Sequence, residues 1–160
     1  MTANRLLKLA HFVGLIIFLG SIFTFIVIST LTKNASLENL AFGRSIISTG
    51  TLVLTLPGMW VLAVSGIFMG IRRYGVKNRF VQIKFILITA IILNAYFFVV
   101  PAAQMASAIA NRSLIIGHLL PGYADAYQRE TLFGAINVLL TMTAAVVGVW
   151  KIGATDRSRQ

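Results

Sequence analysis

The chain has 160 residues, of which 58% are hydrophobic and 11% are charged, and its mean hydropathy is +0.86. Soluble domains carry about 25% charged residues, so this composition excludes an ordinary soluble fold and predicts a membrane protein. The absence of cysteine excludes disulfides, Cys-ligated zinc, iron–sulfur clusters and covalently attached c-type haem. The net charge of +10 does not indicate a nucleic-acid partner, because the basic residues flank apolar runs.

Four apolar segments are each long enough to cross a bilayer, for which a helix needs roughly 20 apolar residues. They lie at about 9–32, 46–71, 81–105 and 131–152. The first exceeds the apolar core of a signal peptide and is expected to be retained. The sequence therefore predicts an all-α membrane protein with a single domain over 1–160. Its fold is expected to be an antiparallel four-helix bundle with an outer loop at about 106–130.

Lys and Arg are distributed unevenly along this bundle. One side is expected to hold Arg5, Lys8, Arg72, Arg73, Lys77, Arg79, Lys84, Lys151, Arg157 and Arg159. The other side is expected to hold Lys33, Arg44, Arg112 and Arg129. Because positive charge accumulates on the cytoplasmic side, the bias predicts cytoplasmic termini and a multi-pass protein of the bacterial inner membrane.

Each apolar segment has a face of small or polar residues at helical spacing. The face of the second segment includes Arg44 and Ser65, and that of the fourth includes Glu130 and Asn137. Such faces are packing seams in most membrane bundles, so they predict the interior of the bundle without indicating a ligand.

Two features of these segments have both a structural and a functional interpretation. Pro57 predicts a kink, which is either an ordinary bend or a widening that admits a ligand. Arg44, Glu130 and Asp125 are either a salt-bridged lid on the outer side or solvated interfacial charges.

His11 is the candidate functional residue, because an ionisable side chain within a membrane helix is costly. His118 lies in the expected outer loop, about 30 Å away across the bilayer, so the two histidines cannot ligate one haem. The residues expected near the depth of His11 are Lys84, Met69, Arg72, Arg73, Trp150 and Lys151. A mono-His haem, with Met69 or no second ligand, fits this cluster. The other interpretation is an interfacial hydrogen-bonding histidine among basic residues that follow the positive-inside rule.

Two runs of sequence carry a family resemblance. KLAHFVGLIIFLGS (Lys8–Ser21) resembles the first helix of small membrane families with a K-x-x-H opening, and FVQIKFILI, which contains Lys84, resembles the start of their third helix. The group comprises four-helix haem-dependent protoporphyrinogen oxidases, the copper-resistance protein D domain and uncharacterised predicted membrane proteins, and this chain is closest to the last. The resemblance implies that His11 is tied to haem b and that Lys84 is functionally important.

Three hypotheses of function follow. The first is a b-type haem protein with His11 as the metal ligand, in electron transfer or oxidation of a lipophilic substrate, as a haem-dependent membrane oxidoreductase. In it, Lys84, Arg72 and Arg73 hold the propionates and Asn94 is a deeper polar contact. The second is a non-enzymatic accessory subunit or assembly factor of a larger membrane complex. The third is copper or small-solute transport through soft ligands. The expected partners are membrane lipid and either a larger membrane complex or a second copy of the chain.

Overall fold

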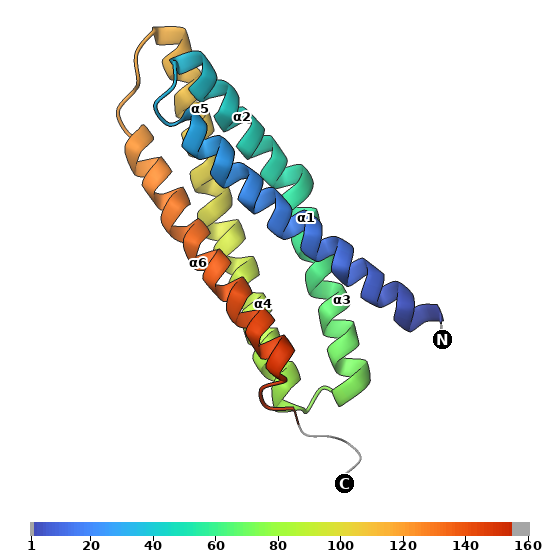
Figure 1. Ribbon diagram of the computed structural model, residues 1–160. Coiled ribbons are helices and arrows are strands. Elements are labelled where there is room, and N and C mark those ends of the chain that lie inside the picture. Colours follow the sequence, from blue (N-terminus) through green and yellow to red (C-terminus); the bar gives the residue numbers. More distant parts are fainter. Residues whose placement is uncertain (1, 155–160) are drawn as a thin grey trace.

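Six α-helices and two π-helical turns form four long rods in the computed structural model, which describes residues 2–154 and the side chains of 4–154. The first rod is α1 (Thr2–Thr32) and the fourth is α6 (Tyr123–Trp150). The second rod consists of α2 (Leu37–Gly50), η1 (Thr51–Thr55) and α3 (Leu56–Tyr74). The third consists of α4 (Arg79–Asn94), η2 (Ala95–Val99) and α5 (Val100–Ile116). The expected all-α architecture is confirmed for the described residues, and Figure 1 shows the rods side by side in a bundle.

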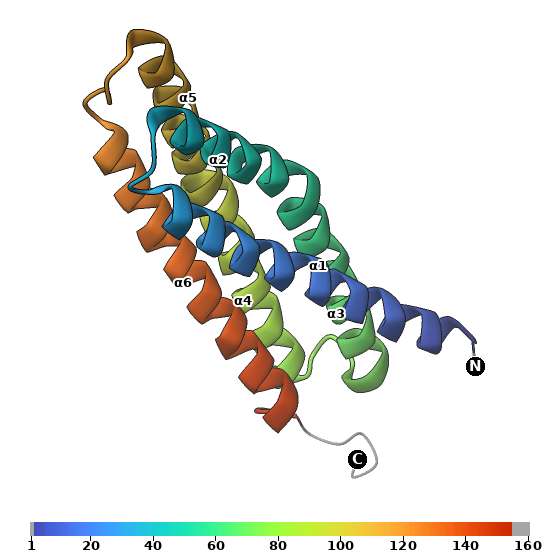
Figure 2. The same cartoon turned by 45° about the horizontal axis from the view of Figure 1, so that its top comes forward.

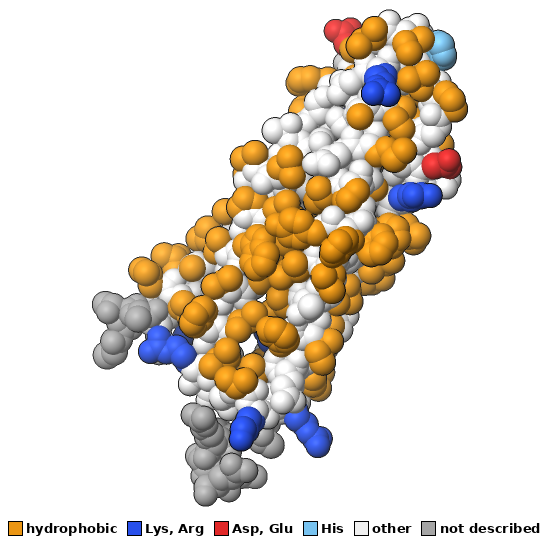
Figure 3. Space-filling model, turned by 180° about the vertical axis from the view of Figure 1, so that it is seen from behind, with side chains coloured by type: hydrophobic (Ala, Val, Ile, Leu, Met, Phe, Trp, Pro, Cys, Tyr) orange, Lys and Arg blue, Asp and Glu red, His pale blue; other side chains and the backbone are white. Residues whose placement is uncertain are grey.

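All four rods are long and apolar enough to cross a membrane. Large apolar side chains are exposed along each of them, and in Figure 3 they cover the middle of the molecule while charged side chains gather toward its two ends. A soluble protein rarely exposes so continuous an apolar surface. The chain therefore has the architecture of a multi-pass membrane protein.

The charged residues distinguish the two ends of the bundle. We call the end formed by the start of α1, residues 75–78 and the end of α6 the basic end, because no described acidic residue lies there. The opposite end, formed by 33–36 and 117–122, carries Glu38, Asp125 and Glu130. Arg157 and Arg159, which contribute to the expected orientation, lie outside the described residues.

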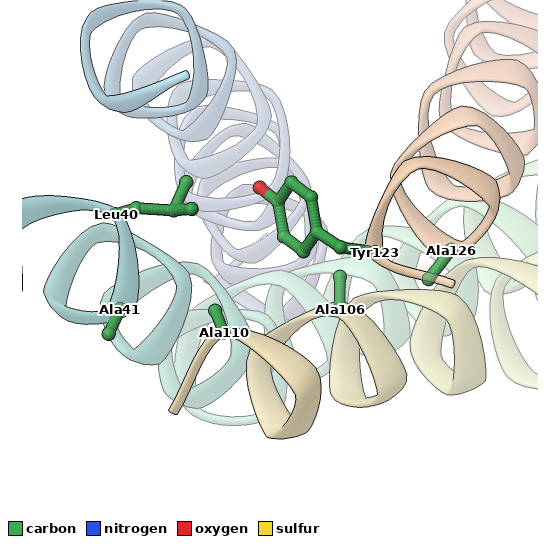
Figure 4. Packing of buried hydrophobic residues seen from close by; sticks show 6 residues of the cluster. All are labelled: Leu40, Ala41, Ala106, Ala110, Tyr123 and Ala126. Atoms are coloured by element: carbon green, nitrogen blue, oxygen red, sulfur yellow. The ribbon is translucent and has the colours of Figure 1, made fainter. Parts of the chain in front are cut away.

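The loop at the opposite end is shorter than the loop expected at about 106–130. The chain is helical up to Ile116 and again from Tyr123, which leaves 117–122 as the connection. At this end of the bundle, α2, α5 and α6 extend beyond the apolar segments and share a small hydrophobic core. In this core, Tyr123 of α6 packs with Leu40 of α2 and Ala106 of α5 (Figure 4). An apolar run marks only the lipid-facing part of a helix. The helical residues on either side of 117–122 that lie outside the apolar runs were therefore expected to belong to the loop.

A close crossing joins α1 to α3. A Cβ atom added to Gly14 would lie 2.6 Å from the backbone nitrogen of Leu62, and one added to Gly58 would lie 2.9 Å from that of Phe18. Small residues let two membrane helices approach in this way. Figures 1 and 2 both show that α1 diverges from α6 toward the basic end. We attribute this divergence to the close contact of α1 with α3.

The π-helical turns lie just before Pro57 in the second rod and Pro101 in the third rod. The Leu56 N–H donates to the Thr51 carbonyl and the Val100 N–H to the Ala95 carbonyl, five residues back in each case. Proline has no N–H and its ring crowds the carbonyl four residues earlier, so the helix before it widens into a π turn. A π turn thus precedes Pro57, where a kink was expected, and a second π turn precedes Pro101.

Gly14→Ala should destabilise the protein, because its new Cβ would push the α1 and α3 backbones apart. We expect a loss of about 1–3 kcal/mol, the usual cost of overpacking, measured as a lower unfolding midpoint in detergent. Gly20→Ala is the matched control, since Gly20 is also within α1 but has no atom within 4 Å of an added Cβ. Equal midpoints for the two variants would contradict the close crossing.

Candidate functional site

Two cavities lie in the bundle between α1 and α6. The first, of about 350 Å³, lies toward the basic end, and we call it the His11 cavity because His11 and Lys84 both line it. The second, of about 340 Å³, lies toward the opposite end, and we call it the Asn137 cavity. Phe18 and Met59 are buried and line both cavities, so they form the partition between them.

The hydrogen bonds of His11 define its tautomer. Its Nδ1 lies 3.1 Å from the Leu62 carbonyl oxygen and 3.1 Å from Ser65 Oγ. The Ser65 hydroxyl donates its own proton to the Val61 carbonyl, so both partners of Nδ1 act as acceptors. We therefore assign the proton to Nδ1, which leaves Nε2 of the neutral ring with a free lone pair. Nε2 makes no hydrogen bond to any described residue.

Two glycines make room for the side chains of this cavity. A Cβ added to Gly66 of α3 would lie 3.0 Å from His11 Cε1, and one added to Gly148 of α6 would lie 2.9 Å from Lys84 Nζ. The Lys84 ammonium group is also 5.3 Å from the centroid of the Phe80 ring, within cation–π range. No pattern in the sequence indicates that either glycine lies beside His11 or Lys84.

The other expected site residues do not line the His11 cavity. Arg72 and Arg73 are exposed at the end of α3, and Met69 is half-buried one turn before them. Asn94 instead donates from Nδ2 to the Phe133 carbonyl at 2.8 Å, which joins α4 to α6. The structure thus brings together His11 and Lys84 from the expected set. Lys84 is the one basic side chain among the described residues that line this cavity.

Met59 and Met142 were not expected in this cavity, although both line it. No sequence pattern places them there, because each belongs to a different helix and neither is close to His11 in the chain. His118 is exposed in the connection at the opposite end, as the sequence predicted for an outer-loop residue.

An ion pair between Arg44 and Glu130 lies beside the Asn137 cavity. The Arg44 side chain is 1% exposed and pairs with Glu130, which lines the Asn137 cavity, and it also donates to Ser29 Oγ at 2.5 Å. Its guanidinium lies 5.1 Å from the centroid of the Tyr127 ring. Of the expected lid, the Arg44–Glu130 bridge is therefore present, whereas Asp125 is exposed and forms no salt bridge in the described part of the chain.

No protein-family model, curated protein or solved structure matches this chain.

Removing one partner of the Arg44–Glu130 pair should lower the stability of the protein far more than replacing both partners. Arg44→Met leaves the half-buried Glu130 carboxylate without its partner, and we expect a loss of about 3 kcal/mol of stability, the lower end of the cost of breaking a buried pair. The double variant Arg44→Met/Glu130→Met leaves no charge unpaired, so it should recover most of that loss. Thermal unfolding in detergent measures both, with Arg112→Met, at an exposed position, as a near-neutral control. A double variant no more stable than Arg44→Met would argue against the pairing.

Proposed function

We propose that this chain is a membrane haem protein in which His11 Nε2 would bind the iron of a b-type haem. The hydrogen bond from His11 Nδ1 to the Leu62 carbonyl is the observation that carries the proposal. Metal-ligating histidines characteristically donate their other ring N–H to such an acceptor, which fixes the tautomer and the ring orientation. The implied likeness to haem-dependent membrane oxidases agrees with this assignment.

The residues of the His11 cavity suit an amphipathic macrocycle. Its walls are largely apolar, and Leu15, Ile88 and Ile91 come from α1 and α4. Lys84 supplies one cation for a propionate. A bound haem would supply one-electron chemistry whose potential depends on the axial ligand and on burial. Propionate contacts from Arg72 and Arg73, a second ligand from Met69 and a polar contact from Asn94 stay predictions.

The open side of the cavity supports a lipophilic reaction partner. Met142, Ala145 and Val149 line the cavity from α6 and are exposed on the surface that faces lipid. A molecule dissolved in the bilayer can therefore approach the site between α1 and α6. We propose electron transfer to, or oxidation of, such a molecule, with the basic end on the cytoplasmic side of a bacterial inner membrane.

Copper handling is the second candidate, because Met59 and Met142 line the same cavity as His11. Thioether and imidazole groups are suitable ligands for Cu(I). An accessory role in a larger complex needs neither ligand, and its distinguishing feature would be a colourless protein that binds no copper.

The visible spectrum of the purified protein tests the haem proposal. We expect a Soret band that shifts on reduction with dithionite and is lost in His11→Asn. Asparagine can still donate to the Leu62 carbonyl, so this variant should fold while it lacks the imidazole ligand. His118→Ala is the control and should keep the band.

A second variant separates ligation from folding. Gly66→Ala keeps the imidazole but places a methyl group 3.0 Å from His11 Cε1, so the band should weaken or shift. A protein expressed with haem supplied that shows no Soret band, or a His11→Asn variant that keeps it unchanged, would refute the proposal. In the colourless case, Cu(I) titration would decide between the remaining candidates.

A further inference from the structure

We propose that the Asn137 cavity is a second ligand site and that it binds a neutral, lipid-soluble ring compound of the quinone–quinol class. The proposal is independent of haem in the His11 cavity, from which Phe18 and Met59 separate this site.

The position of the cavity in the bundle points to a built site. Both π-helical turns line it, η1 through Thr51 and Thr55 and η2 through Ala95 and Val99. The turns lie at similar depths, because α3 and α4, which connect them to the loop at 75–78, have 19 and 16 residues. π-helical turns are frequent at functional sites. In membrane proteins, corresponding interruptions in two helices commonly mark a binding site.

Polar groups stand on two different walls of this cavity. On the η1 wall, the Thr51 hydroxyl donates to the Ile47 carbonyl at 2.7 Å, so its oxygen remains available as an acceptor. On the α6 wall, Asn137 is 5% exposed and its amide oxygen has no hydrogen-bond partner among the described residues. A buried amide oxygen without a partner is rare and unfavourable, and a ligand that donates a hydrogen bond would supply what it lacks.

The charge of the cavity selects a neutral ligand. Glu130 is the one carboxylate that lines it, and its charge is balanced by Arg44. The remaining wall is largely apolar. The ligand must therefore be uncharged, with an apolar body and oxygen atoms that reach both polar walls. A para-quinol has hydroxyl groups on opposite edges of one ring, so one can donate to the Asn137 amide oxygen and the other to the Thr51 hydroxyl oxygen, whereas the oxidised quinone has no donor for either acceptor.

The cavity also has an opening toward lipid. Ile26 and Thr30 of α1 and Thr131 and Ala135 of α6 line it and are exposed. A ring can thus enter from the bilayer while its aliphatic tail remains among the acyl chains. This lateral entry suits a quinone better than a water-soluble ligand.

Decylubiquinol, the reduced form with two ring hydroxyl groups, is the probe, and ligand-induced thermal stabilisation of the purified protein in detergent is the readout. The cavity is blocked with Gly134→Leu, because an added Cβ at Gly134, which lines the cavity, has no atom within 4 Å and the larger side chain would enter open space. Gly20→Leu is the matched control, since Gly20 is equally free of contacts but lines neither cavity.

We expect decylubiquinol to stabilise the wild type and Gly20→Leu equally, and to bind Gly134→Leu at least tenfold more weakly. Asn137→Leu should fold normally, because it removes an amide that lacks a partner, and should also bind at least tenfold more weakly. Thr143→Val, an exposed position on α6 whose hydroxyl bonds only its own helix, should bind as the wild type does.

His11→Asn distinguishes this proposal from the haem proposal. That variant should retain the full stabilisation by decylubiquinol, with or without a Soret band in the wild type. No stabilisation of the wild type, full stabilisation of Gly134→Leu, or loss of stabilisation in His11→Asn would overturn the assignment to the Asn137 cavity.

Discussion

The close crossing of α1 and α3 at Gly14 and Gly58 is the contact on which the rest of the structure depends. It brings the backbone of α1 against that of α3, and this places His11 beside the Leu62 carbonyl. The same contact draws α1 away from α6 (Figure 1). The space that opens between those two helices contains both cavities, so one pair of glycines determines the position of the histidine and the room in front of it.

The backbone hydrogen bonds of the second and third rods are a second constraint on the structure. In the apolar part of a bilayer, every N–H and C=O group needs an internal partner. Pro57 and Pro101 remove one donor each, and the helices respond with π turns that keep the neighbouring groups bonded. Because both turns border the Asn137 cavity, the two prolines mark the part of the bundle interior where helix geometry departs most from an ordinary packing seam.

The charged residues show how polar groups are accommodated in this interior. Arg44 is almost completely buried, yet it has Glu130, Ser29 and an aromatic ring as partners. Lys84 has no carboxylate beside it in the described part of the chain, and its ammonium group is instead near Gly148 and the Phe80 ring. Lys84 is half-buried, and a cation without a carboxylate partner inside a membrane bundle is costly and is usually retained for function. The basic end, and not the Arg44 end, is therefore where a negatively charged group such as a propionate would be stabilised.

The sequence was sufficient to predict the four spans, because each contains an apolar run of bilayer length. It also predicted that His11 and Lys84 lie at similar depth, and the structure places both at one cavity. It could not predict that Arg72 and Arg73 point away from that cavity, because depth does not determine the rotation of a helix about its axis. That rotation follows from the α1–α3 crossing. The sequence allowed the third helix to continue to about residue 111 but did not predict its end at Ile116. The reason is related, since Ala106 and Ala110 are buried by contacts with other helices and not by lipid.

The assignment of the His11 proton is the claim on which the site depends, and nitrogen NMR of the two histidines tests it most directly. The measurement uses protein with ¹⁵N-labelled imidazoles, purified free of haem, with His118→Ala to assign the signals. The account predicts a His11 ring that is protonated at Nδ1 and bare at Nε2. A ring with its proton on Nε2 would contradict it, because Nδ1 would then face the Leu62 carbonyl without a hydrogen and no lone pair would be available to a metal in the cavity.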